Sequence, residues 1–219
     1  MKKVKILNLY ACLGGNRYKW DEVVKENNIE IEVTAVELDD ELAKLYQKRF
    51  PNDIVIVCDA HQYLLENYKN FDFIWSSPPC PTHSRINISQ YTRYSWKPHF
   101  PDMKLYEEII FLKHFYKGEF VIENVIPYYE PLIPAQKRGR HLYWSSFIIP
   151  NYKTNDAKIR EWQLPQLEKH HNIDLSDYKG KQNKRKIARN LVDYEAGRTI
   201  FETYLGITKK QNEKQLNLF

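Results

Sequence analysis

Short apolar runs alternate with longer segments of mixed polarity over the first two thirds of the chain. The runs are rich in Val, Ile and Phe and predict strands, and apolar residues at helical spacing between them predict helices. The predicted strands are Val4–Tyr10, Ile31–Val36, Ile54–Val57, Phe71–Ser76, Phe120–Ile122 and His141–Ile148, and the predicted helices are Asp21–Asn27, Asp40–Phe50, His61–Tyr68 and Met103–Tyr116. This order is typical of a doubly wound, Rossmann-like α/β sheet, which binds its ligands at the carboxyl ends of the strands.

The pattern changes after residue 149. We expect residues 1–149 to form the main domain, whereas Lys, Asn, Asp and Gln dominate residues 150–186 and predict a small loop-rich insertion. A helical pattern near Asp193 to Leu205 predicts that residues 187–206 return to the main domain. Residues 207–219 are polar and charged, which predicts a mobile tail.

The positive charge is concentrated near the C-terminus. The formal net charge is +5, with 19 basic and 19 acidic side chains in residues 1–150, against 14 and 9 in residues 151–219. A basic segment beside a neutral body suits binding to a phosphate backbone, and a solvated basic face is the alternative interpretation.

The cysteines Cys12, Cys58 and Cys80 have no paired spacing, which predicts reduced thiols and leaves one of them available as a nucleophile. The sequence contains no run of about 18 apolar residues, so a transmembrane helix is not predicted. We therefore expect a monomeric cytoplasmic protein, and the scattered histidines do not predict a metal site.

Groups that suit an adenosine follow three successive predicted strands. The turn Tyr10–Gly15 follows the first strand, and its paired glycines let the backbone approach a ligand. Glu37 ends the second strand, where a carboxylate can accept hydrogen bonds from ribose hydroxyls, and Asp59 follows the third as an acceptor for an exocyclic amine. The alternative role for either acid is to cap the next helix. A complete Gly-x-Gly-x-x-Gly is missing, so a sulfonium nucleoside fits better than a pyrophosphate.

A candidate catalytic group follows the fourth predicted strand. Two prolines fix the backbone before Cys80, which suits a nucleophile that must be held close to its target atom. A buried structural cysteine in a proline turn is the alternative. Glu123 ends the next strand, and the extended segment Gln136–Arg140 is expected to point Arg138 and Arg140 to one side.

Taken together and in this order, the motifs resemble those of the cytosine-C5 methyltransferase family. The resemblance covers Lys5 to Phe147 and Arg189 to Leu205. The matching motifs are the glycine turn Asn8–Gly15, Pro-Pro-Cys at 78–80, Glu-Asn-Val at 123–125, Gln-x-Arg-x-Arg at 136–140 and a last cofactor motif, Asn190–Val192. The chain departs from the usual pattern at Asn8, where aspartate is usual, at Cys12 and Arg189, where glycine is usual, and at Leu38, where tryptophan is usual.

The resemblance implies a DNA methyltransferase that transfers a methyl group from S-adenosylmethionine to carbon 5 of a cytosine flipped out of the duplex. Cys80 would add to carbon 6, Glu123 would serve nitrogen 3 if burial raises its pKa, and Arg140, supported by Arg138, would hold the carbonyl at carbon 2. Ser84–Pro101 is expected to be a loop that closes over the base. The expected cofactor contacts are Tyr10, Leu13, Gly14, Gly15, Glu37, Leu38, Asp59, Ala60, Pro79, Asn190 and Val192.

Double-stranded DNA is the expected partner, in a restriction-modification or phage DNA-modification setting. The expected DNA contacts are Ser84, Arg85, Lys181, Lys184, Arg185 and Lys186. Residues 150–186 would be a reduced target-recognition region with short or loose sequence readout. An RNA cytosine-C5 methyltransferase and an inactive cofactor-binding or DNA-binding module are the alternatives. Amino-methyltransferases are disfavoured because they carry an aromatic residue in place of Cys80, and zinc deaminases because His83 stands where their second cysteine belongs.

The last five residues resemble the Gln-Leu-x-Leu-Phe peptide by which bacterial DNA-processing proteins dock onto the replication sliding clamp. Leu218 and Phe219 are apolar side chains on a charged segment, so they are expected to enter a pocket on another protein. The expected docking residues are Gln215, Leu216, Leu218 and Phe219. Folding back onto the catalytic core is the alternative.

Overall fold

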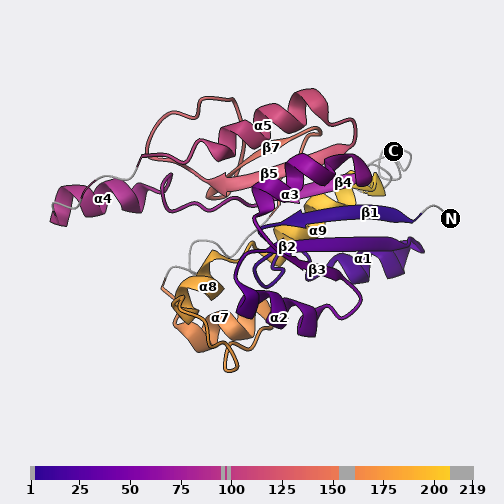
Figure 1. Ribbon diagram of the computed structural model, residues 1–219, viewed down its shortest axis with the longest axis horizontal. Coiled ribbons are helices and arrows are strands. Elements are labelled where there is room, and N and C mark those ends of the chain that lie inside the picture. The colour runs from indigo at the N-terminus through magenta and orange to yellow at the C-terminus, as the bar shows by residue number, and fades with distance from the viewer. Residues whose placement is uncertain (1–2, 95–96, 98–99, 153–160, 208–219) are drawn as a thin grey trace, which may run out of the picture.

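Seven strands form one sheet in the part of the chain that the computed structural model describes, residues 3–94, 97, 100–152 and 161–207 (Figure 1). The strands are β1 (Val4–Leu9), β2 (Ile31–Glu37), β3 (Ile54–Val57), β4 (Phe73–Ser76), β5 (Glu119–Val125), β6 (Gln136–Arg138) and β7 (His141–Ser145). Their order across the sheet is β3-β2-β1-β4-β5-β7-β6. Strands β1 to β5 are parallel, and β7 is antiparallel to both of its neighbours. The predicted doubly wound fold is confirmed.

At two of the strand boundaries that differ from the prediction, polar side chains bond to the backbone. Strand β4 begins at Phe73 rather than Phe71, since the Asp72 carboxylate accepts a hydrogen bond from the Lys5 backbone N–H at 2.9 Å. Strand β7 ends at Ser145 rather than Ile148, and the next hydroxyl, that of Ser146, accepts a hydrogen bond from the Phe120 backbone N–H at 2.9 Å.

Helices cover both faces of the sheet. They are α1 (Trp20–Asn27), α2 (Asp40–Arg49), α3 (Ala60–Asn67), α4 (Arg85–Tyr94), α5 (Lys104–Phe115), α7 (Leu164–His171), α8 (Lys184–Asn190) and α9 (Tyr194–Tyr204), with a short 3-10 turn at Tyr68–Asn70. Successive side chains of a strand point to opposite faces. Leu7 of β1 therefore packs with α3 and α5, whereas its neighbour Ile6 packs with α1 and α9. Helices α1, α2, α3, α5 and α9 lie within two residues of their predicted positions.

The segment predicted to be a loop-rich insertion contains the short helix α7 and the first residues of the short helix α8. Helix α7 begins with a reciprocal capping box between Gln163 and Gln166, and Asn183 caps α8. Each helix buries only one or two apolar side chains, such as Leu167 and Ile187, so the apolar periodicity was too weak to predict them. These residues share a small core with Leu13.

The segment Ser84–Pro101 also differs from the prediction, because it contains helix α4 instead of a loop alone. Figure 1 shows α4 extending away from the sheet and its covering helices. Two apolar side chains in the first turns of this helix, Ile86 and Ile88, are 50% and 38% exposed. None of the helices in the described ranges has the length and apolar character needed to cross a bilayer.

Helix α9 completes the face formed by α1. The Phe201 ring stacks on Trp20 with a centroid distance of 4.8 Å, and the Tyr204 ring stacks on Phe73 at 4.3 Å. The Trp20 indole N–H donates to the Gly197 carbonyl at 3.2 Å. A segment close to residue 200 thus forms part of the same core as the first two strands.

A buried ion pair holds the glycine turn against α2. The Arg17 guanidinium donates two hydrogen bonds to the Asp53 carboxylate, both at 3.0 Å, and the two side chains are 4% and 3% exposed. The Tyr46 hydroxyl donates to the same carboxylate at 2.8 Å. Removing one partner of such a pair leaves an uncompensated charge in the interior.

We expect Asp53→Ala to lower the free energy of unfolding by about 3–5 kcal/mol, because Arg17 would lose its buried counter-charge. Asp21→Ala is the matched control: Asp21 pairs with the same guanidinium at 2.7 Å but is 64% exposed. An exposed pair contributes less than about 1 kcal/mol. Urea denaturation of both variants measures the difference, and equal losses would contradict this account.

Candidate functional site

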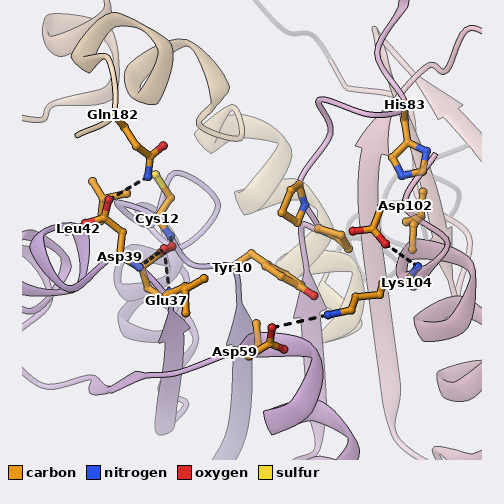
Figure 2. A pocket seen from close by; sticks show the side chains of 15 residues that line it. Tyr10, Cys12, Glu37, Asp39, Leu42, Asp59, His83, Asp102, Lys104 and Gln182 are labelled. Atoms are coloured by element: carbon orange, nitrogen blue, oxygen red, sulfur yellow. Dashed lines mark hydrogen bonds and ion pairs between the residues drawn. The ribbon is translucent and has the colours of Figure 1, made fainter. Parts of the chain in front are cut away.

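A cavity of about 570 Å³ lies at the carboxyl ends of the central strands, where the strand order reverses between β1 and β4 (Figure 2). This is the position at which doubly wound sheets bind ligands, and the volume suits a small molecule. The lining residues are Tyr10, Cys12, Glu37, Leu38, Asp39, Leu42, Asp59, Ala60, Pro78, Pro79, His83, Asp102, Lys104, Leu105 and Gln182.

The turn after β1 forms one wall of the cavity. Tyr10, Cys12 and Gly14 have φ values of 55°, 47° and 65°, in the left-handed region that favours glycine. Cys12 stands where the family usually has glycine, and the backbone keeps the glycine-like conformation there despite the side chain. Such a conformation costs a non-glycine residue roughly 1–3 kcal/mol and persists only when its surroundings enforce it.

Glu37 at the end of β2 enforces this conformation. Its carboxylate accepts hydrogen bonds from the backbone N–H groups of Cys12, Leu38 and Asp39 at 2.8, 2.9 and 3.0 Å. Burial raises the pKa of Glu37, and the three N–H groups oppose that shift. Since a carboxylate can accept about four hydrogen bonds, one acceptor position stays open for a ribose hydroxyl.

Asp59, the other predicted carboxylate, caps a helix as well as lining the cavity, and so does Asp39, which was not predicted. Asp39 accepts from two N–H groups of α2, and Asp59 accepts from the Gln62 N–H at the start of α3. The second oxygen of Asp39 bonds to Tyr178 and Gln182, and that of Asp59 lies 3.8 Å from the Lys104 ammonium. For Asp59, the predicted role of lining the cavity and the alternative role of capping the next helix are therefore both present.

The cavity brings together six of the predicted cofactor residues and leaves out five. Tyr10, Glu37, Leu38, Asp59, Ala60 and Pro79 line it, whereas Leu13, Gly14, Gly15, Asn190 and Val192 do not. Leu13 is buried in the core beneath α7 and α8. A side chain on Gly14 would collide with the rings of Tyr46 and Phe50, and one on Gly15 would collide with the Val192 backbone. These glycines hold the turn in place and do not face the cavity.

The chemistry of the lining fits a nucleoside sulfonium. Carboxylates at two strand ends can accept from hydroxyl and amine groups, and Leu38, which is 69% exposed, offers an apolar surface for a ring. His83, Asp102, Lys104 and Gln182 also line the cavity and were not predicted. Their positions at the cavity depend on the course of the loops before α4, α5 and α8, which no local sequence signal reveals.

Cys80 lies just beyond this cavity, at the end of β4. Its carbonyl accepts hydrogen bonds from the backbone N–H groups of His83 and Ser84, and the Asn124 amide holds the Pro78 carbonyl at 3.0 Å. The Cys80 side chain is half-buried. Burial and the Glu123 carboxylate raise the pKa of the Cys80 thiol, whereas Lys186 and Arg189 of α8 oppose this shift.

His141 is a neighbour of Glu123 that the sequence did not reveal. Its Nε2 lies 3.6 Å from the Glu123 Oε1, and both side chains are largely buried. His141 pairs with Val125 in the β5–β7 register, two residues from Glu123 on the same strand. The two side chains therefore share one face of the sheet. The contact between His141 and Glu123 follows from the register of β7 against β5, which the sequence alone does not give.

The arginine motif is arranged differently from the prediction. Strand β6 ends at Arg138, and Gly139 turns the backbone with a φ of 55°, so strand alternation does not continue to Arg140. The Arg138 guanidinium donates to the Ile149 and Pro150 carbonyl groups at 2.9 and 3.2 Å through its Nε. Arg138 thus anchors the segment after β7. Burial lowers the pKa of His171 in α7 to about 3, and Arg140 contributes to this shift.

The predicted DNA contacts divide into exposed and internally bonded groups. Lys181 and Lys186 are exposed, whereas the Lys184 ammonium donates to the Ser176 carbonyl at 3.1 Å and the Arg185 Nε donates to the Trp162 carbonyl at 3.0 Å. Ser84 forms an isolated bridge with Pro127, and Arg85 donates to the Pro127 carbonyl at 3.5 Å. The predicted clamp peptide, Gln215, Leu216, Leu218 and Phe219, lies outside the described residues, so clamp docking stays a hypothesis.

The sheet order and the position of the cavity define an S-adenosylmethionine-dependent methyltransferase fold. The methyltransferase EhMeth of Entamoeba histolytica has a similar fold, with a TM-score of 0.55 and 11% identity over 94% of this chain and 99% of that chain. A DNMT2 variant from Spodoptera frugiperda aligns over 56% of this chain and 35% of that chain, with 25% identity and a TM-score of 0.38. No curated protein sequence matches the chain.

The family follows from the sequence match. Residues 4–126 match the family described as C-5 cytosine-specific DNA methylase, and the chain belongs to that family. The match includes Cys80 and Glu123 and ends before the arginine motif. The resemblance drawn from the sequence motifs is thereby confirmed, and S-adenosylmethionine-dependent methyl transfer is the chemistry that this family implies.

We expect alkylation of Cys80 by iodoacetamide to accelerate with increasing pH up to values above 9.0, the ordinary pKa of a thiol, because burial and Glu123 raise the pKa of Cys80. Glu123→Gln should shift this profile to lower pH, and Arg189→Ala should shift it to higher pH. Glu119→Gln, at the other end of β5, is the control and should leave the profile in place. Peptide mass spectrometry separates Cys80 from Cys12 and Cys58, and an unchanged profile in Glu123→Gln would rule out this electrostatic arrangement.

Proposed function

We propose that the protein is a DNA methyltransferase that methylates carbon 5 of cytosine through a covalent adduct with Cys80. The observation that carries this proposal is the position of Cys80. Its thiol is half-buried at the end of β4, Pro79 beside it lines the cavity, and Glu123 is close enough to act on its charge. A nucleophile, a neighbouring carboxyl group and a cofactor cavity therefore adjoin one another.

The cavity would hold S-adenosylmethionine through Glu37, Asp59 and Leu38, and the bound cofactor would supply an electrophilic methyl group. Carbon 5 of cytosine is a poor nucleophile. Attack by the Cys80 thiolate on carbon 6 forms an S–C bond and moves the electron pair of the 5,6 double bond to carbon 5. Carbon 5 would then form a bond to the methyl group, and the bond between that methyl group and the cofactor sulfur would break to leave a neutral thioether. A base removes the proton from carbon 5, and the bond between Cys80 and carbon 6 breaks to restore the double bond and the thiolate.

Glu123 is the group that would stabilise charge on nitrogen 3 during the addition. His141, at 3.6 Å, would hold the Glu123 carboxyl group in place. Lys186 and Arg189 favour the thiolate form of Cys80, which the attack requires. Two basic residues of α8 thus favour the thiolate form of Cys80, and the same helix belongs to the basic C-terminal part of the chain.

Support for DNA over RNA comes from the description of the matching family. The basic C-terminal part of the chain supports binding to a phosphate backbone, which DNA and RNA share. The target base in a duplex is hidden by stacking, so it must be flipped out before Cys80 can reach carbon 6. The helix α4, which follows the catalytic motif and extends from the body, is the element available to cover it. Methylation of RNA by the same residues is the alternative.

We expect Cys80→Ala to lower methyl transfer by roughly 10³-fold or more, the scale of losing a nucleophile, while the cofactor still binds. Tritium transfer to matched DNA and RNA duplexes measures activity, and DNA containing 5-fluorocytosine should trap the intact enzyme covalently. Cys58→Ala, which removes a thiol outside the site, is the control. A covalent adduct of Cys80→Ala would exclude this nucleophile, and transfer to RNA alone would favour the RNA enzyme.

The exposed lysines beside α8 should contact phosphates with little base specificity, because a flexible ammonium acts as a point charge. We expect the double variant Lys181→Gln, Lys186→Gln to bind duplex DNA more weakly and to reduce the salt slope of binding by about 0.9 for each phosphate that is no longer neutralised. Lys113→Gln, Lys117→Gln, exposed at the end of α5, is the control. Fluorescence anisotropy at several salt concentrations measures the slopes, and bisulfite sequencing tests that the methylated sequence is unchanged. A changed sequence with unchanged affinity would instead assign base readout to these lysines.

A further inference from the structure

A carboxylate that the proposed chemistry does not use is buried behind the cavity. Glu108 of α5 is fully buried. Its Oε1 accepts a hydrogen bond from the Tyr10 hydroxyl at 2.6 Å and lies 3.2 Å from the His61 Nδ1, and its Oε2 accepts from the Ser76 hydroxyl at 2.7 Å. A charged residue is almost never buried in this way unless several partners compensate it.

The contacts of Glu108 indicate an ionised carboxylate. All three neighbours can donate to it, and an ionised carboxylate is the form that only accepts. Burial and the charge of Glu108 raise the pKa of Tyr10. The Tyr10 hydroxyl therefore stays protonated and donates a hydrogen bond to Glu108. The hydrogen bond to Glu108 raises the pKa of His61. In a low-dielectric interior such a charge acts over a longer distance than it would in water.

Tyr10 connects this charge to the cavity. Its hydroxyl group bonds to Glu108, and its ring forms part of the cavity wall, where Figure 2 shows it among the lining side chains. The left-handed backbone conformation at Tyr10 directs the side chain from the end of β1 toward α5. A ring face attracts a cation, and a negative charge behind the ring strengthens that attraction.

Most of the other charged side chains on the cavity wall are acidic. Asp59 and Asp102 are carboxylic acids on the wall, as are Glu37 and Asp39, against a single lysine, Lys104. The Gln62 N–H lowers the pKa of Asp59, and burial lowers the pKa of His83, so the acid is ionised and the histidine neutral near neutral pH. A ligand that carries a positive charge is therefore favoured over a neutral ligand of the same shape.

We propose that Glu108, acting through Tyr10, makes the cavity discriminate between the positively charged sulfonium cofactor and the neutral thioether that remains after methyl transfer. The inference rests on the proposed function, because it assumes that this cofactor binds in the cavity. Both ligands share the adenosine and amino-acid parts and differ by one charge at sulfur. Stronger binding of the cation lets fresh cofactor displace the spent molecule, so Glu108 is a positioning and specificity residue that does not touch the ligand.

The test compares Glu108→Gln with the intact protein by isothermal titration calorimetry in mildly alkaline buffer. The ligands are S-adenosylhomocysteine, which is neutral at sulfur, and sinefungin, which carries a charged amine in place of the methylsulfonium group. We expect Glu108→Gln to weaken sinefungin binding about fivefold, the size of one partly screened charge interaction, and to leave S-adenosylhomocysteine binding unchanged. The glutamine oxygen can still accept from Tyr10, so the shape of the wall is kept.

Glu107→Gln is the matched control, because this substitution removes the same charge from the same helix. The Glu107 carboxylate lies 3.4 Å from the His61 Nε2, but its side chain is 62% exposed. It should leave the ratio of the two dissociation constants unchanged. Tyr10→Phe keeps the ring, removes the link to Glu108 and should reproduce part of the Glu108→Gln effect. This variant carries the test if Glu108→Gln does not fold.

Equal weakening of both ligands in Glu108→Gln, or no change in the ratio in either variant, would overturn the inference and leave the proposed function intact. Failure of the intact protein to bind either ligand would instead contradict the proposed function. A larger change in Glu107→Gln than in Glu108→Gln would show that the discrimination comes from surface charge, and this also would overturn the role of Glu108.

Discussion

The arrangement of the site depends on one carboxylate, that of Glu37. It bonds to the backbone of the turn after β1 and to the first residues after β2, so it joins the ends of two neighbouring strands. This contact holds Cys12 in a conformation that its side chain disfavours. The same turn leads to Arg17 and its buried partner Asp53. The position of Tyr10, the course of the turn and the start of α2 therefore follow from a single set of three hydrogen bonds.

The parts of the site that the sequence predicted are those fixed by strand ends. Glu37 and Asp59 line the cavity, and Cys80 follows the lining residue Pro79 and lies near Glu123. Each of these residues lies near the carboxyl end of a parallel strand, and these strands end at the same edge of the sheet. No knowledge of loop geometry was needed for this prediction. The order of the apolar runs was also sufficient for the sheet and five of its helices, since alternate residues face opposite layers.

The residues that the sequence could not place depend on contacts between distant segments. Arg138 and Arg140 were expected to point to one side, but Gly139 ends the extended segment and Arg138 bonds to carbonyl groups after β7. His141 meets Glu123 only through the pairing of β7 with β5. Glu108 lies next to the exposed Glu107, and nothing in the local pattern distinguishes the buried acid from the exposed one. Short helices such as α7 bury too few apolar residues to produce a periodic signal.

The packing of α9 on α1 has a consequence for biosynthesis. The ribosome releases a chain from its N-terminus, so the glycine turn, the catalytic cysteine and Glu123 all emerge before the helix that covers Trp20 and Phe73. Until Phe201 and Tyr204 arrive, those two rings lack the partners that stack on them, and the Val192 backbone is not yet in place against Gly15. A nascent chain that ends before α9 therefore contains the residues of the proposed chemistry, but its core around Trp20 and Phe73 lacks the side chains of α9. The core on this face of the sheet is therefore complete only after α9 has been synthesised.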